Sequence, residues 1–266
     1  MSFQRLHEYI NHRLKDSPVY QNELAAEYGT ENFAYFLYAL VKMAKPQVML
    51  ELGTGAGITS FMAAQAMKEN GFGIVYTVDD ASQWSDVAMF VRDYFGVADL
   101  DYPTFIDLAT RKFDLAEHVR AVSTHLATDT LYMPPGIDKL DMVYVDCLTT
   151  TVRDIGATMA FYLPRLKLYS SMFWDNASTH NHAFLFVEYV VKEFQAGRIP
   201  VFLQRLSQQD VAALWTMVRT CKFTLVHLTD DYRGKFNKLQ NSRAWLKIEP
   251  NDFVPHGAAE GGVASF

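Results

Sequence analysis

The first residues that could do chemistry are an acid and three alternating glycines. The stretch Val48–Ser60 reads VMLELGTGAGITS, in which Glu51 precedes Gly53, Gly55 and Gly57. Glycines at this spacing allow a sharp turn and let a ligand approach the main chain closely. The apolar run before them predicts a short buried strand, and ITSFMAAQAM after them predicts a helix. The sequence therefore predicts a strand, a glycine turn and a helix that bind a ligand.

The spacing and charge of this loop separate the candidate ligands. A dinucleotide-binding loop reads G-x-G-x-x-G and faces a pyrophosphate, whereas the glycines here are spaced Gly53-x-Gly55-x-Gly57. Glu51 would repel a phosphate and would suit a ligand that carries an ammonium group. This disfavours a nicotinamide-dependent dehydrogenase. The remaining interpretation is that the three glycines only form a tight turn and bind no ligand.

A second set of polar residues follows further apolar runs. YTVDD ends in Asp79 and Asp80, LDMVYVD ends in Asp146, and MFWDN ends in Asp175 and Asn176. Strands that alternate with helices predict right-handed βαβ units and a mainly parallel sheet, in which ligands bind beyond the carboxyl ends of the strands. The last three of these residues offer oxygen ligands, which suit a hard cation such as Mg²⁺.

The acid, the G-x-G-x-G loop and the acid after the second strand resemble the class I S-adenosylmethionine-dependent methyltransferases. The resemblance covers roughly residues 33–250. In that family the acid that ends the second strand holds the ribose hydroxyls, which matches Asp79, with Asp80 as a one-residue alternative. The cofactor-binding residues that the resemblance implies are Glu51, Gly53, Thr54, Gly55, Gly57, Asp79, Asp80 and Asp146.

The aspartates after the fourth and fifth predicted strands resemble the metal-dependent O-methyltransferases of the catechol and caffeoyl-CoA type. That resemblance implies that Asp146, Asp175 and Asn176 hold Mg²⁺ and, through it, the substrate hydroxyl. One departure is clear: the family places a basic lysine three residues beyond the first aspartate, and Thr149 stands there. Asp146 and His180 are the catalytic candidates, with His182 and His125 as other possible bases.

The implied activity is transfer of a methyl group to a hydroxyl of a small molecule, assisted by a divalent metal. Two alternatives stay open. One is a metal-independent N- or O-methyltransferase of natural-product metabolism. The other is a non-catalytic partner protein that binds the cofactor, which the missing lysine would explain.

The composition limits the classes of partner. The 266 residues are half hydrophobic, which suffices for one sizeable core. The net charge of −6 gives no general attraction to nucleic acid or to an anionic membrane. Cys147 and Cys221 form neither a disulfide framework nor a metal-binding spacing, so we expect a reduced, cytoplasmic setting. We also expect no signal peptide, no membrane span and, as a base rate, a homodimer.

The elements that must position these residues imply a Rossmann-like methyltransferase fold. We expect an α/β protein with a seven-stranded, mainly parallel sheet, the last strand antiparallel, helices on both faces and an N-terminal helical cap. The expected parts are a cap over 1–45, the cofactor-binding domain over 46–250 and a flexible tail over 251–266. The expected strands are 48–52, 73–79, 119–124, 140–146, 169–176, 223–229 and 242–250. The expected helices are 3–15, 22–29, 31–44, 58–67, 85–95, 150–166, 182–194 and 207–220, with an inserted helix or loop within 96–118.

Overall fold

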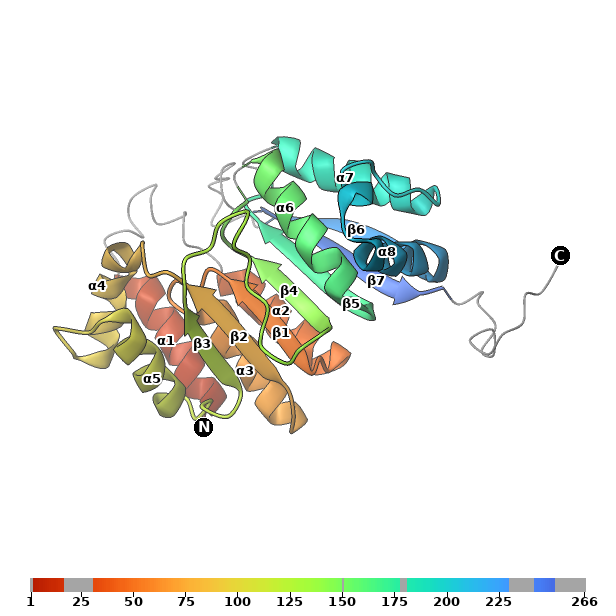
Figure 1. Ribbon diagram of the computed structural model, residues 1–266. Coiled ribbons are helices and arrows are strands. Elements are labelled where there is room, and N and C mark those ends of the chain that lie inside the picture. Colours follow the sequence, from red (N-terminus) through yellow and green to blue (C-terminus); the bar gives the residue numbers. More distant parts are fainter. Residues whose placement is uncertain (1, 17–30, 150, 178–180, 230–241, 252–266) are drawn as a thin grey trace.

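The computed structural model describes residues 2–16, 31–149, 151–177, 181–229 and 242–251. The strands are β1 (Val48–Leu52), β2 (Ile74–Asp79), β3 (Val119–Ser123), β4 (Leu140–Val145), β5 (Leu166–Asp175), β6 (Cys221–Thr229) and β7 (Ser242–Pro250). They form one sheet in the order β3-β2-β1-β4-β5-β7-β6 (Figure 1). β7 runs antiparallel to β5 and β6, and the pairs from β3 to β5 are parallel.

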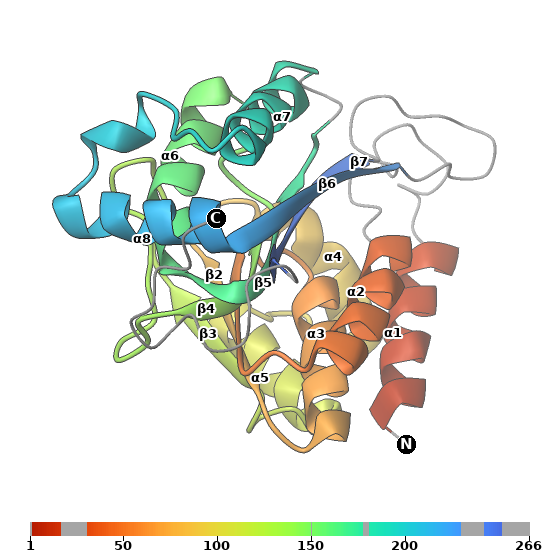
Figure 2. The same cartoon turned by 90° about the vertical axis from the view of Figure 1, so that its right-hand side faces the viewer.

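Helices cover both faces of the sheet. The α-helices are α1 (Ser2–Asp16), α2 (Glu31–Ala44), α3 (Ile58–Asn70), α4 (Trp84–Phe95), α5 (Tyr102–Lys112), α6 (Val152–Tyr162), α7 (Asn181–Gln195) and α8 (Gln208–Thr220). The first five contribute to the core on one face, and the last three to the core on the other. Figure 2 shows α1, α2 and α3 on one side of the sheet and α6 and α8 on the opposite side.

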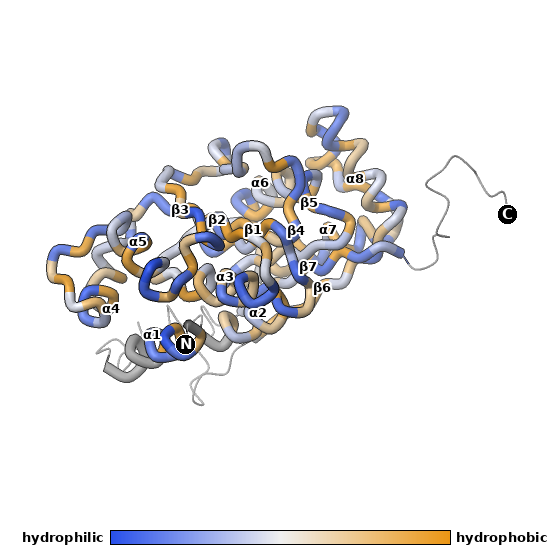
Figure 3. Tube along the Cα trace, turned by 90° about the horizontal axis from the view of Figure 1, so that it is seen from below, coloured by the Kyte–Doolittle hydropathy of each residue, from blue (hydrophilic) through white to orange (hydrophobic). Residues whose placement is uncertain are grey.

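The strand sequences explain why the sheet has two cores. In β1, Met49 packs into the core beneath α1–α5, whereas Leu50 and Leu52, on the opposite face of the strand, pack into the core beneath α6–α8. Successive side chains of a strand point to opposite faces, so a strand that is buried on both faces reads as a continuous apolar run. In Figure 3 hydrophobic segments lie along the central strands and hydrophilic ones lie mainly at the periphery.

The expected elements agree with the structure to within a few residues at their ends. Pro164 ends the predicted long helix, because α6 stops at Tyr162 and a 3-10 turn over Leu163–Arg165 follows. The inserted segment contains α5, which Asp101 caps by accepting a hydrogen bond from the Thr104 amide. The predicted helix over 22–29 and the tail from residue 252 lie outside the described residues.

Helices α1 and α2 belong to the layer that covers the sheet. Leu6, Tyr9 and Ile10 of α1 are each only 1% exposed, and they share one core with Phe33 of α2 and Phe61 of α3. None of the helices among the described residues is long and apolar enough to cross a lipid bilayer.

Candidate active site

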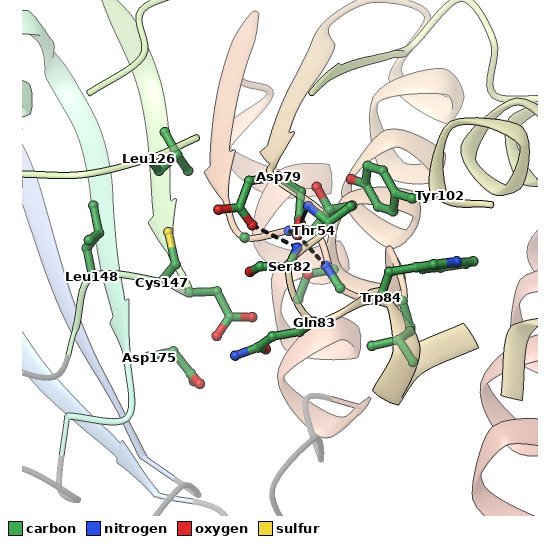
Figure 4. A pocket seen from close by; sticks show the side chains of 18 of the residues that line it. Thr54, Asp79, Ser82, Gln83, Trp84, Tyr102, Leu126, Cys147, Leu148 and Asp175 are labelled. Carbon is green, nitrogen blue, oxygen red and sulfur yellow. Dashed lines mark hydrogen bonds between the residues drawn. The ribbon is translucent and has the colours of Figure 1, made fainter. Parts of the chain in front are cut away.

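A pocket of about 570 Å³ opens at the edge of the sheet where β1, β2, β4 and β5 end (Figure 4). This volume is in the usual range for small-molecule sites. Its described lining residues include four aspartates and no lysine, arginine or histidine. The lining residues are Gly53, Thr54, Gly55, Ala56, Ile58, Thr59, Asp79, Asp80, Ala81, Ser82, Gln83, Trp84, Val87, Tyr102, Leu126, Asp146, Cys147, Leu148, Thr149, Asp175 and Asn176. The wall is therefore acidic and suits a cationic ligand.

The three glycines of the loop have different structural roles. Gly53 has φ +91°, and a Cβ there would lie 3.1 Å from the main-chain carbon of Asp146, so glycine lets β1 and β4 end side by side. Gly57 has φ +70°, and its Cβ would lie 2.5 Å from the Phe61 ring. A Cβ on Gly55 would meet nothing within 4 Å, so this residue leaves its side of the loop open. The loop is therefore fixed at its ends and open in the middle.

Asp79 holds the glycine loop from the neighbouring strand. Its Oδ2 accepts hydrogen bonds from the amides of Thr54 (2.7 Å) and Gly55 (3.1 Å), and its Oδ1 accepts one from Ala81 (2.6 Å). Figure 4 shows the Asp79 carboxyl directed at the loop beside Thr54. The acid that the sequence assigns to a ligand's hydroxyls thus also organises the main chain that lines the pocket.

Asp80 lies at the rim of the pocket. It accepts hydrogen bonds from the Ser82 amide (2.9 Å) and pairs with His125 Nδ1 (2.9 Å). The hydrogen bonds from Ser82 and His125 lower the pKa of Asp80 to about 2. Asp80 therefore presents a fixed negative charge at neutral pH, and His125 is its partner.

Glu51 lies beneath the loop, outside the pocket wall. Its carboxyl is fully buried and accepts hydrogen bonds from the hydroxyls of Thr59, Ser60 and Thr77, the last at 2.6 Å. Burial raises the pKa of Glu51 to about 7, even though the three hydroxyls act in the opposite direction. This position ties β1 and β2 to the first turn of α3, and contact between Glu51 and a ligand stays a prediction.

Asp146 and Asp175 meet on the far side of the pocket. Asp146 follows β4, Asp175 ends β5, and their carboxyl groups lie within hydrogen-bonding reach of each other. Burial, followed by the nearby Asp175 carboxyl, raises the pKa of Asp146 well above its usual range. Within the described part of the chain, Tyr144 Oη and Asn176 Oδ1 are buried without a hydrogen-bond partner. The structure thus brings together all three residues that the sequence assigns to a metal.

Arg243 adds a cation that the sequence reasoning missed. It faces Asp175 across the β5–β7 pair, and its Nε lies 2.7 Å from Asp175 Oδ1. The Arg243 side chain is 2% exposed, and its guanidinium lies 4.9 Å from the centre of the Phe33 ring on α2. The signal in the sequence was a lone arginine in the otherwise apolar half of SRAWLKIEP, but its distance along the chain from Asp175 hid the pairing.

These contacts fit a metal ion poorly. The donor set has the oxygens that Mg²⁺ prefers, and the Asn176 oxygen is available. However, the Asp175 oxygen that lies beside Arg243 already has a cationic partner. Of the three predicted magnesium ligands, Asp146 and Asn176 could offer an oxygen atom, whereas the Asp175 carboxylate is already paired with Arg243.

The remaining candidates are the possible base His180, Thr149 at the position of the family's lysine, and two tyrosines that the sequence did not indicate. His180 lies outside the described residues, so its role as a base stays a prediction. Thr149, at the position of the family's lysine, is buried and lines the pocket. Two tyrosines were missed: Tyr102 lines the pocket beside Trp84, and Tyr9 Oη donates a hydrogen bond to the Ala56 carbonyl at 3.0 Å. No local sequence pattern indicated either tyrosine, because each lies on a helix that is far from the glycine loop in the sequence.

A family model matches the part of the chain that contains most of this site. Residues 50–177, which span the glycine loop and Asp146 to Asn176, match the family model described as a methyltransferase domain. A search of curated proteins found no significant match to the sequence.

Solved structures of the same fold include two methyltransferases. The O-methyltransferase TomG of Streptomyces achromogenes, involved in tomaymycin synthesis and solved with S-adenosylmethionine, is 14% identical; the match covers 92% of this chain and 89% of TomG, with a TM-score of 0.51. The S-adenosylhomocysteine-bound methyltransferase PaMTH1 of Podospora anserina is 10% identical, with 92% and 87% coverage and a TM-score of 0.50. The Rossmann-like fold predicted from the sequence is confirmed.

Proposed function

Because residues 50–177 match the methyltransferase domain model, we propose that this protein is a class I, S-adenosylmethionine-dependent enzyme that methylates a hydroxyl group of a small molecule. The observation that carries the proposal is the acidic pocket: four aspartates and an open glycine loop line it, with no basic side chain among the described lining residues. Bound S-adenosylmethionine supplies a methyl group on a cationic sulfur and also carries an ammonium group. Such a ligand suits this charge.

The described residues offer a partner for each part of that cofactor. Asp79 and Asp80 end β2 and would accept hydrogen bonds from the ribose hydroxyls. Trp84 stacks on Phe105, with ring centres 5.3 Å apart, and its indole forms part of the wall where an adenine would lie. Gly55 leaves the middle of the loop open to the ligand. Glu51 would act from below, by holding Thr59 and Ser60 at the start of α3.

The acceptor hydroxyl would lie beside Asp146. In the transfer, the methyl carbon leaves the sulfonium sulfur and bonds to the acceptor oxygen, and the hydroxyl proton must go to a base. Asp146 lines the pocket and is the carboxyl best placed to take that proton, with Asp175 beside it. The remaining work is positioning, which can contribute about 7–11 kcal/mol when the reacting atoms are well aligned.

Oxygen is proposed as the acceptor because a carboxyl pair can both orient a hydroxyl and accept its proton. Magnesium has no part in this proposal, because Arg243 competes for one of the three predicted ligands. A small-molecule substrate, a homodimeric assembly and a cytoplasmic location stay proposals on the grounds given by the sequence.

A titration with S-adenosylhomocysteine tests the cofactor assignment. We expect micromolar binding to the wild type and at least about tenfold weaker binding to Asp79→Asn, because the loop amides lose a charged acceptor. Asp107→Asn is the matched control, since Asp107 lies on α5 and pairs with Arg111. Absence of binding to the wild type would refute the proposal.

A screen of hydroxylated small molecules with S-adenosylmethionine then tests catalysis. Formation of a methyl ether would support the hydroxyl as acceptor, and transfer to amines alone would favour the N-methyltransferase alternative. Cofactor binding without turnover on the whole panel would favour a non-catalytic partner protein.

A further inference from the structure

We propose that the guanidinium of Arg243 is the resident cation of this site, in place of a divalent metal, and that methyl transfer here is metal-independent. This inference deepens the proposed function, because it concerns the same pocket. Three residues with metal-binding chemistry converge here, yet one of their carboxylates is already paired with an arginine.

Strand pairing fixes the place of Arg243. It stands opposite Asp175 in the antiparallel register of β5 and β7, so the sheet itself sets the separation of the two side chains. The Nε–Oδ1 distance is 2.7 Å, and the arginine is 2% exposed. A guanidinium does not lose its proton in proteins. The positive charge is therefore permanent and cannot swing away into solvent.

The buried guanidinium of Arg243 has favourable contacts on two sides. The guanidinium carbon lies 4.9 Å from the ring centre of Phe33 on α2. The Phe33 ring also packs against the rings of Tyr144 and Phe173, with ring centres 5.0 and 5.5 Å away. Cation–π contact on one side and a carboxylate on the other compensate the burial of the charge. Removal of the arginine would leave Asp175 buried without its cation, so the pair is a stable feature of the fold.

A divalent cation would compete with Arg243 for the Asp175 carboxylate. A divalent cation bound to the Asp175 carboxylate would lie close to the guanidinium that pairs with Asp175 Oδ1, and two positive charges at such short range repel each other. The charge of a nearly inaccessible arginine therefore opposes the binding of Mg²⁺ at Asp175. Asp146 and the Asn176 oxygen alone do not make the ligand set of the metal-dependent enzymes.

Arg243 acts on the pair of carboxyl groups and not on the substrate. It holds Asp175, and Asp175 lies within hydrogen-bonding reach of Asp146, which lines the pocket. Arg243 is thus a positioning residue: it fixes the carboxyl pair from behind without contact with the substrate. The metal-dependent enzymes that the sequence resembles would use an exchangeable ion for this purpose, whereas here the cation is part of the chain.

Metal binding can be measured without any substrate. After treatment with EDTA, the full-length protein is titrated with Mn²⁺ and followed by electron paramagnetic resonance. We expect no specific Mn²⁺ site in the wild type or in Arg243→Lys, which keeps the charge. We expect Arg243→Met to bind Mn²⁺ at least about tenfold more tightly than the wild type does, because loss of the positive charge leaves Asp146, Asp175 and Asn176 available to the ion.

Lys247→Met is the matched control, since it removes a positive charge from the same strand at a surface pair with Glu249. It should create no Mn²⁺ site. Tight Mn²⁺ binding by the wild type would overturn the inference, and so would an Arg243→Met protein that folds but binds no more Mn²⁺ than the wild type. If Arg243→Met does not fold, the wild type and Arg243→Lys decide.

A parallel titration with S-adenosylhomocysteine, with EDTA present, separates this inference from the proposed function. Unchanged cofactor affinity in EDTA, and activity that EDTA does not reduce, are the expected results. Loss of cofactor binding in every buffer would refute the proposed function and leave the statement on metal binding intact. Activity that disappears in EDTA and returns with Mg²⁺ would refute the inference.

Discussion

At the scale of single residues, Glu51 shows how a charged side chain can be both deeply buried and well placed. Three hydroxyls satisfy its oxygens, yet the pKa is about 7 because few water molecules can reach the carboxyl. At neutral pH the group is therefore divided between its two protonation states. A cationic ligand above the loop would favour the ionised state.

The sign of the resulting pH dependence follows from linkage. The pKa of Glu51 is 4.5 in its ordinary state and about 7 in the fold, so between these values the folded protein binds more protons than the unfolded chain. The contribution of Glu51 to the free energy of unfolding is therefore present in full below pH 4.5. It is lost as the pH rises toward 7, by an amount on the order of 3 kcal/mol.

Glu51→Gln should remove this decline, because the amide keeps the shape and can still bond the hydroxyls. The measurement is urea unfolding of both proteins at several pH values from 5 to 8. Glu117→Gln, which changes an exposed carboxyl, is the control and should follow the wild type. Parallel curves for wild type and Glu51→Gln would contradict the assignment.

At the scale of elements, the glycine loop is held from several directions. Asp79 binds its amides from β2, Tyr9 binds the Ala56 carbonyl from α1, and the Phe61 ring of α3 lies against Gly57. The ring of Phe61 cannot yield easily, because Phe105 and Phe113 pack against it with centres 6.0 and 5.7 Å away. The loop is thus pre-shaped before any ligand arrives.

Gly57→Ala should therefore lower the free energy of unfolding by about 2 kcal/mol or more, through the left-handed backbone and the contact with Phe61. Gly71→Ala is the control: Gly71 has φ +83° at the other end of α3, but a Cβ there meets nothing within 4 Å. It should cost only about 1 kcal/mol. Chemical denaturation and titration with S-adenosylhomocysteine check the two effects, and only Gly57→Ala should weaken cofactor binding.

The elements also show what could be predicted from the sequence. The strand–glycine–helix unit was predictable because its signals are local: an apolar run, three glycines and a helical pattern stand next to one another. The convergence of Asp146 and Asp175 followed from parallel strands that end at one edge. Arg243 could not be placed, because its pairing depends on the register between β5 and β7, which no local pattern fixes. Tyr9 and Tyr102 could not be placed either, because each lies on a helix far from the glycine loop in the sequence and only the packing of that helix brings it to the site.

At the scale of the whole molecule, the question is whether the N-terminal helices are a separate cap. Leu6 and Ile10 are 1% exposed in a core that continues through Phe61 to the sheet. A core that two regions share favours cooperative unfolding. We therefore expect α1 and the sheet to unfold together.

Leu6→Ala tests this expectation. It should lower the free energy of unfolding by about 3 kcal/mol, and the transitions followed by far-UV circular dichroism and by tryptophan fluorescence should move together. Gln4→Ala, on the exposed face of α1, should leave both unchanged. An early transition seen by only one of the two probes would instead support the separate cap over residues 1–45 that the sequence suggested.

The place of Trp84 has a practical consequence. Of the four tryptophans of the chain, Trp84 is the one among the described pocket-lining residues, and its indole nitrogen donates to the Leu100 carbonyl at 3.1 Å. A ligand that enters the pocket replaces water next to this ring and changes its emission. The protein therefore carries its own optical reporter, so that stopped-flow fluorescence could time the arrival and departure of ligands without any attached dye.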